Sequence, residues 1–231
     1  MSIYVLVHGS LMGGWCWREV ANYLRAEGHE VFTPTLTGAG ERAHLLSRDV
    51  GFYTYVQDIV GVLECEDLQE VILVGYSGGG LVITGVAEKV PERLSRMVYL
   101  DSLELKDGQS YFDIAPPELV AEYKKIAEEK GFGWLLPYLD TTPPRWQPIP
   151  LLWCTQSLEI KNPAAVKIPR GYIHCTVRSH DGSALALGMA MYDRAAEEAK
   201  ANGWWYREIE AHHGVVFTHP KELSDLLLEL A

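Results

Sequence analysis

Apolar runs alternate with helix-like segments along most of the chain. The runs with the composition of β-strands are residues 3–7, 30–33, 71–74, 97–100, 171–175 and 205–209. The segments with helical character are residues 17–27, 54–63, 81–90, 184–201 and 220–230. Because the strands are apolar and helices connect them, the pattern predicts an α/β fold with a mostly parallel sheet covered by helices on both faces.

The pattern changes between about residues 106 and 167, where prolines interrupt it repeatedly and tryptophans recur at Trp134, Trp146 and Trp153. We expect this segment to form a small cap. It is inserted into a single domain that spans residues 1–231, because this length suits one hydrophobic core. A helical excursion above the edge of the sheet would roof a pocket, which the three tryptophans would line.

Composition and charge exclude several classes of protein. Hydrophobic residues make up 48% of the chain and charged residues 22%, which excludes global disorder. The net charge of −11 would repel nucleic acids and anionic membranes, so we expect neither as a partner. No apolar stretch approaches the roughly 20 residues that cross a bilayer, and the amino terminus lacks the features of a signal peptide. A small-molecule partner and a homodimer both stay compatible with the sequence.

The cysteines indicate a reducing compartment. The chain has four of them, Cys16, Cys65, Cys154 and Cys175, and none forms a Cys-x-x-Cys pair. We therefore expect free thiols in a cytoplasmic protein rather than disulfides or a zinc site. We expect no cofactor and no metal ion.

The strongest chemical signal follows the strand at residues 71–74. There the sequence Gly75-Tyr76-Ser77-Gly78-Gly79 has the form Gly-x-Ser-x-Gly and leads into a helix. This strand-to-helix setting is that of a nucleophile elbow, in which small residues let the backbone turn sharply while the serine hydroxyl projects into a site. We expect Ser77 to be the nucleophile.

A serine hydroxyl needs a base within hydrogen-bond reach. The loop before the last helix offers three histidines, His212, His213 and His219. His219 directly precedes Pro220, which favours an extended conformation and a structural role. The residue types alone leave the choice between His212 and His213 open.

The loop after the first strand supplies the other half of the predicted site. Its sequence is His8-Gly9-Ser10-Leu11-Met12-Gly13-Gly14. Such a turn can direct backbone N–H groups at an oxyanion, and we expect the N–H groups of Ser10 and Gly78 to do so. Met12 would contribute to an apolar pocket suited to an aromatic or short acyl group. His8 is expected to brace the loop.

Together these motifs resemble the hydroxynitrile lyase and plant methylesterase branch of the α/β-hydrolase superfamily, and in particular its bacterial esterase-like members. The resemblance covers nearly the whole chain. The motifs that carry it are His8-Gly9-Ser10, Gly13-Gly14-Trp15-x-Trp17, Pro34 to Arg42, Gly75-x-Ser77-x-Gly79, Tyr99-Leu100-Asp101 and His213 to Leu223. The resemblance implies that the base is His213, since the catalytic histidine of the family lies seven positions before the proline.

Two departures from the family pattern bear on the reaction. The lyases of the family have a threonine where Gly9 stands and a lysine where Gly214 stands. A site without that hydroxyl and ammonium would stabilise and protonate cyanide poorly. The methylesterases of the family have glycine at the position of Gly9, as this chain does. The resemblance therefore implies cleavage of a small ester through an acyl-enzyme on Ser77.

The sequence offers two candidates for the acid, the third member of the triad. The family places its acid at the position of Arg178, and a guanidinium cannot orient an imidazolium. Asp181 lies three residues further on, and Asp101 ends the strand after the elbow helix. We favour Asp101, because a carboxylate that ends an apolar strand is rarely a merely solvated charge.

Two other classes of function stay open. One is a carbon–carbon lyase or cyclase that uses His213 as a general base without an acyl-serine. The other is a non-catalytic binder of small molecules on the same fold. A protein that had lost its activity could also lack the acid at its usual position, as this chain does.

Overall fold

In the computed structural model the centre of the molecule is a six-stranded sheet with the order β2-β1-β3-β4-β7-β8. The structure describes residues 1–137, 145–178 and 184–231. All neighbouring strands of this sheet run parallel. The strands are β1 (Ile3–Val7), β2 (Glu30–Phe32), β3 (Val71–Tyr76), β4 (Leu94–Leu100), β7 (Arg170–Cys175) and β8 (Trp205–Ile209). The predicted fold class is thus confirmed.

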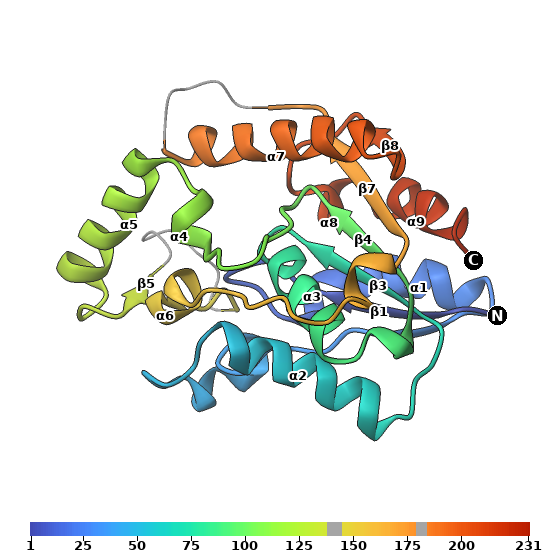
Figure 1. The fold of residues 1–231 in the computed structure, drawn as a ribbon, viewed down its shortest axis with the longest axis horizontal. Helices are drawn as coiled ribbons and strands as arrows, with labels where there is room; N and C mark the ends of the chain where they lie inside the picture. The colour runs from blue at the N-terminus through green and yellow to red at the C-terminus, as the bar shows by residue number, and fades with distance from the viewer. Residues whose placement is uncertain (138–144, 179–183) are drawn as a thin grey trace.

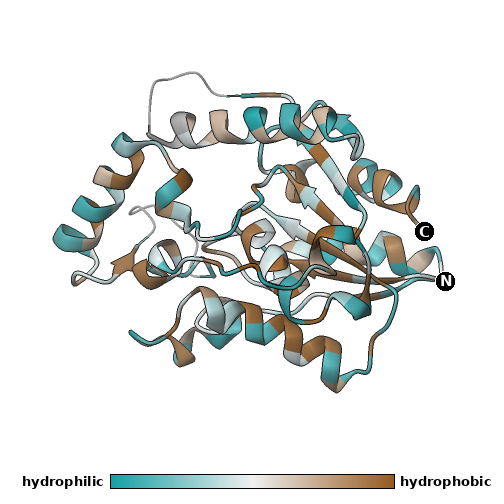
Figure 2. Ribbon diagram, viewed as in Figure 1, coloured by the Kyte–Doolittle hydropathy of each residue, from teal (hydrophilic) through white to brown (hydrophobic). Residues whose placement is uncertain are grey.

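Helices cover both faces of the sheet (Figure 1). Successive side chains of a strand point to opposite faces, so a strand that is apolar throughout must be buried on both. On β1, Val5 and Val7 belong to one buried cluster, while Tyr4 and Leu6 belong to the other. The first cluster lies against α2 (Phe52–Cys65), α3 (Gly78–Lys89) and α7 (Ala184–Ala201), and the second against α1 (Arg18–Ala26) and α9 (Pro220–Leu228). In Figure 2 hydrophobic residues run along the strands and α2, whereas hydrophilic residues recur on α5 and α7.

The segment predicted as a cap contains further elements. They are α4 (Tyr111–Ile114), α5 (Pro117–Lys130), α6 (Leu151–Thr155) and a short antiparallel pair, β5 (Leu135–Leu136) with β6 (Ile149–Pro150). Figure 1 shows α4, α5, α6 and β5 gathered at the end of the molecule opposite the two termini. The remaining short helices are Gly14–Trp17, Gly40–Leu45, Pro91–Arg93, Ala165–Lys167 and α8 (Val215–Thr218). None of the described helices is long and apolar enough to cross a bilayer.

The order of the strands determines where a site can form. From β1 the chain moves to β2 on one side and later to β3 on the other. The crevice at the carboxyl ends of the strands at such a reversal is the usual ligand site of an α/β protein. Because the strands are parallel, the loops that follow β1, β3, β4, β7 and β8 all leave the sheet at this edge. These loops carry Ser10, Ser77, Asp101, Arg178 and His213.

Candidate active site

Ser77 occupies a strained turn between β3 and α3. Its φ is 53° and its ψ is −124°, a conformation that a residue with a side chain rarely adopts. The turn is tight because helix α3 begins directly behind the strand. A Cβ atom on Gly75 would lie 2.7 Å from the carbonyl carbon and oxygen of Gly79 and from Cα of Gly80. Glycine is therefore required at position 75 for the helix to approach the strand.

We predict that Gly75→Ala lowers the free energy of unfolding by about 1–3 kcal/mol, because the new methyl group would push against rigid backbone. Urea denaturation of the purified variant measures the change. Gly61→Ala on α2 is the matched control, since a Cβ at Gly61 meets no atom within 4 Å. That change should stabilise the helix by about 0.5–1 kcal/mol. Unchanged stability of the Gly75 variant would contradict the steric argument.

His213 meets the serine from the loop that follows β8. Its Nε2 atom lies 3.0 Å from Oγ of Ser77. The hydroxyl of Tyr76 donates a hydrogen bond of 2.6 Å to the carbonyl oxygen of His213, which fixes the loop behind the imidazole. His212 is exposed, and His219 binds the side chain of its neighbour Thr218. Of the three histidines in this segment, the structure brings His213 to Ser77.

Asp101 completes a chain of hydrogen bonds behind His213. It follows β4 in a turn with φ of 42°, and its side chain is fully buried. Its Oδ2 atom lies 2.6 Å from Nδ1 of His213. The structure thus joins Asp101, the acid that we favoured, to the imidazole. The alternative acid, Asp181, lies outside the described residues.

Arg178 binds the same carboxylate from the end of β7. Its Nη1 atom donates to Oδ2 of Asp101 at 2.8 Å, and its Nη2 atom donates to Oδ1 at 2.6 Å. Burial by itself raises the pKa of the Asp101 carboxyl, but the hydrogen bonds from His213 and Arg178 outweigh it and hold the pKa below its usual value. Asp101 is therefore ionised at neutral pH.

Sequence reasoning missed this role of Arg178. It noted that the arginine occupies the usual position of the acid and correctly excluded it as a partner of the imidazole. In the structure the guanidinium instead neutralises and orients the carboxylate of Asp101, which follows the neighbouring strand β4 and contacts His213 in place of an acid at position 178. An arginine in the place of the family's acid was the available signal, because it implies a carboxylate close by.

Tyr192 is a second residue that the sequence did not reveal. It lies on α7, and its hydroxyl oxygen is 3.4 Å from Oγ of Ser77. Its ring stacks on the imidazole of His213 at an interplanar angle of 7°, with ring centroids 5.1 Å apart. No motif on α7 marks this position, because the contact depends on how the helix crosses the sheet edge.

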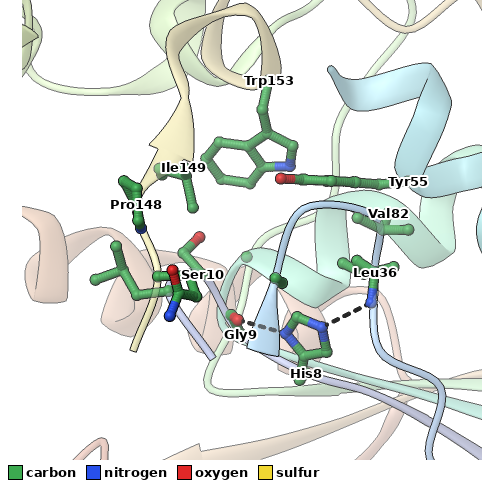
Figure 3. Close-up of a pocket in the computed structure, with 13 residues that line it drawn as sticks. His8, Gly9, Ser10, Leu36, Tyr55, Val82, Pro148, Ile149 and Trp153 are labelled. Carbon is green, nitrogen blue, oxygen red and sulfur yellow. Dashed lines mark hydrogen bonds between the residues drawn. The ribbon is translucent and has the colours of Figure 1, made fainter. Parts of the chain in front are cut away.

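A small apolar cavity adjoins the predicted oxyanion hole. Ser10 and Gly78 line it, and a Cβ atom on Gly78 would lie 3.3 Å from the backbone nitrogen of Ser10, so the two loops meet closely. Figure 3 shows Trp153 and Tyr55 on one side of this cavity and Ser10 on the other. The cavity thus lies directly beside the two predicted N–H donors.

His8 braces the floor of this cavity, as expected. Its Nε2 atom accepts a hydrogen bond of 3.1 Å from the backbone N–H of Leu36, and its Nδ1 atom lies 2.8 Å from the carbonyl oxygen of Gly9 (Figure 3). Burial lowers the pKa of His8 to about 4, so the ring is neutral at pH 7. A neutral ring with its proton on Nδ1 satisfies both contacts.

The four side chains predicted to line a pocket have different surroundings. Trp153 lines the cavity beside Ser10. Trp146 packs against Trp15 and Phe217, with ring centroids 5.9 and 6.3 Å away. Trp134 lies under the guanidinium of Arg48, and Met12 is buried in the cluster beneath α1 and α9. Within the described residues, these last three do not line the cavity.

The fold and the arrangement of Ser77, His213 and Asp101 are those of an α/β-hydrolase. Residues 4–226 match the alpha/beta hydrolase family, and the chain belongs to this family. A structural neighbour has a TM-score of 0.78 and 25% identity, with 99% of this chain and 98% of that chain covered. It is an extracellular alpha/beta-hydrolase from a Paenibacillus species, described as sharing structural and functional homology with tobacco salicylic acid binding protein 2.

Over about half of its length the chain is similar to an esterase and to plant methylesterases, the kind of relative that the motifs predicted. It is 46% identical over 127 residues to a carbendazim hydrolyzing esterase of Nocardioides sp. (strain SG-4G), and the match covers 53% of this chain and 52% of that protein. It is also 33% identical over 128 residues to putative methylesterase 14, chloroplastic, of Arabidopsis thaliana. This match covers 55% of this chain and 37% of that protein. The chain thus spans about half, or less, of the length of these curated relatives.

Proposed function

We propose that the protein is a serine hydrolase that cleaves a small carboxylic ester through an acyl-enzyme on Ser77. The observation that carries this proposal is the continuous chain of contacts from Ser77 Oγ to His213 Nε2 at 3.0 Å, and from His213 Nδ1 to Asp101 Oδ2 at 2.6 Å. This is the geometry in which an imidazole can remove a proton from a serine while a carboxylate fixes its tautomer. The esterase and methylesterase relatives support the same reaction.

The proposed reaction has two halves. His213 takes the proton of Ser77 as Oγ attacks the ester carbonyl, and the N–H groups of Ser10 and Gly78 stabilise the oxyanion. His213 then returns this proton to the oxygen of the alcohol as its bond to the acyl carbon breaks. A water molecule attacks the acyl-enzyme with His213 as base, which releases the carboxylic acid and restores Ser77. The negative charge of Asp101 stabilises the imidazolium in both halves.

The substrate that we propose is the methyl ester of a small acid with an apolar, flat acyl part. The cavity next to Ser10 and Gly78 is bounded by Leu36, Tyr55 and Trp153, which favour such a group. Glycine at positions 9 and 214, in place of the hydroxyl and ammonium of the lyases, supports hydrolysis over cyanide chemistry. A methyl ester is also consistent with the names of the plant relatives.

Labelling with a fluorophosphonate tests the acyl-serine directly. We predict that intact-protein mass spectrometry shows one phosphonyl adduct, that peptide mapping places it on Ser77, and that hydrolysis of p-nitrophenyl esters stops in proportion to labelling. Ser77→Ala should take up no label. Substrate turnover without an adduct would indicate a lyase or cyclase that uses His213 as base. No turnover above the Ser77→Ala variant on an ester panel would indicate a binding protein.

The compartment and the partners belong to the same proposal. All four cysteines are free thiols, and Cys16, Cys154 and Cys175 are buried, which supports a cytoplasmic location. The net charge of −11 disfavours contact with nucleic acids and anionic membranes. The small ester is then the main partner, and the homodimer stays a prediction.

A further inference from the structure

The hydroxyl of Tyr192 stands beside the reacting oxygen without a part in the triad. It lies 3.4 Å from Oγ of Ser77. Given the proposed ester hydrolysis at Ser77, the position of this hydroxyl indicates which part of the reaction the tyrosine serves.

Several contacts hold Tyr192 in this position. Its ring is stacked on His213, and the guanidinium carbon of Arg178 lies 5.9 Å from the ring centroid. Arg178 also donates through Nε to the carboxylate of the next residue, Asp193, at 2.8 Å. The hydroxyl of Tyr172 donates to the carbonyl oxygen of Tyr192 at 3.0 Å. The same arginine that holds the triad acid thus also ties α7, with its tyrosine, to the site.

The hydrogen-bond chain determines the direction of the contact between the two hydroxyls. The nitrogen Nδ1 of His213 donates to ionised Asp101, so Nε2 is the acceptor for the single proton of the Ser77 hydroxyl. Tyr192 must therefore be the donor to Oγ in the free enzyme. Burial raises the pKa of Tyr192 far above neutrality, which keeps its proton available for donation.

The contact with Oγ weakens once the reaction begins. When Oγ becomes the bridging oxygen of an acyl group, it is a poorer acceptor than a free hydroxyl. The tyrosine hydroxyl and Nε2 of His213 lie 3.4 and 3.0 Å from the same atom, Oγ of Ser77. An alcohol oxygen that leaves the acyl carbon bound to Oγ and takes its proton from Nε2 therefore departs close to the tyrosine hydroxyl. The charge that develops there lies on the leaving-group oxygen.

We propose that Tyr192 is a catalytic residue that donates a hydrogen bond to the leaving-group oxygen during formation of the acyl-enzyme. The bond between the acyl carbon and this oxygen breaks, His213 supplies the proton, and Tyr192 keeps its own proton throughout. A strongly basic leaving group such as methoxide carries much charge in the transition state and needs this donor. A weakly basic group such as p-nitrophenolate delocalises its charge and does not. Tyr192 therefore makes the site selective for esters of simple alcohols.

Replacement of Tyr192 with phenylalanine tests the assignment, because it removes the hydroxyl and keeps the ring that stacks on His213. The substrates are the methyl and p-nitrophenyl esters of one acid, benzoic acid or another acid that the native protein turns over. The ratio kcat/KM reports acylation in both cases. We expect Y192F to lower kcat/KM for the methyl ester about 10²–10³-fold, as the loss of an oxyanion donor does, and to change the p-nitrophenyl ester only a few-fold. Tyr23→Phe, at an exposed position on α1, is the control and should alter neither ester.

The comparison of the two esters decides the outcome. Any result in which the methyl ester does not lose more than the p-nitrophenyl ester overturns the proposal, and an equal loss would indicate that the hydroxyl merely supports the position of Ser77 or His213. A failure of the proposed function would be visible separately. In that case the native protein would hydrolyse neither ester, or Ser77→Ala would hydrolyse both as well as the native protein does.

Discussion

Replacement of His213 with alanine is expected to lower kcat for ester hydrolysis about 10⁶-fold, the effect of removing the base of a serine hydrolase. Without the imidazole, none of the described side chains that contact Ser77 Oγ can take its proton at neutral pH. The hydroxyl of Tyr192 is held by burial in its neutral form and cannot act as a base. Initial rates with a p-nitrophenyl ester, measured against a buffer blank, quantify the loss.

The neighbouring histidine is the matched control for this experiment. His212 is exposed, so His212→Ala should change kcat by no more than a few-fold. Both variants should keep the fold, because His212 is exposed, His213 is partly exposed, and Asp101 keeps its two hydrogen bonds from Arg178 when the imidazole is removed. If His212→Ala proved the inactive variant and His213→Ala the active one, the assignment of the base would be wrong.

Asp101→Asn is expected to lower kcat about 10⁴-fold, as the loss of a triad acid can. An amide at this position would no longer stabilise the imidazolium, and its NH₂ group would favour the wrong tautomer of His213. The change also breaks a buried ion pair, since Arg178 contacts both carboxylate oxygens. Removal of one partner of a buried pair costs about 3–5 kcal/mol. The rates should therefore be measured well below the melting temperature of the variant.

Two aspartates serve as controls for Asp101→Asn. Asp181→Asn removes the alternative acid and should retain most of the activity. Asp193→Asn keeps the contact of Arg178 with Asp101 but removes a second carboxylate that Arg178 binds, so it separates a general disturbance of the arginine from loss of the acid. Equally mild effects at Asp101 and Asp181 would contradict the proposed triad.

Arg178 explains how the acid can lie on β4 rather than after β7. A carboxylate with no exposed surface is costly unless its charge is compensated. His213 reaches only one oxygen of Asp101, whereas Arg178 reaches both. Arg178 stands at the position where the resemblance places the acid of the family, and in this structure it binds the carboxylate that the loop after β4 carries. Because the guanidinium already neutralises part of the charge of Asp101, the carboxylate stabilises the imidazolium of His213 less than an unpaired carboxylate would.

The sequence by itself predicted the sheet, and it selected Ser77 and His213, the two residues that the structure brings together. Each of the six predicted strands is present. The inner strands β1 and β3 were the clearest, because a strand buried on both faces is apolar along its length and that pattern is local, whereas the edge strands β2 and β8 carry charged residues. Ser77 was readable because the sharp turn requires glycine at fixed offsets, as the close approach of Gly79 to Gly75 shows. The choice of His213 over His212 came from the family resemblance, which places the catalytic histidine seven positions before the proline at which α9 begins.

Only the tertiary structure decided which side chains surround these two residues. Asp101 is separated by 112 positions from His213, and Arg178 by 77 positions from Asp101. Tyr192 reaches Ser77 only because α7 crosses the carboxyl edge of the sheet, and Trp146 turns to Trp15 and Phe217 rather than to the cavity beside Ser10. The physical reason is that local patterns set the type and length of an element. The strand order and the paths of the loops set the direction in which its side chains meet those of distant segments.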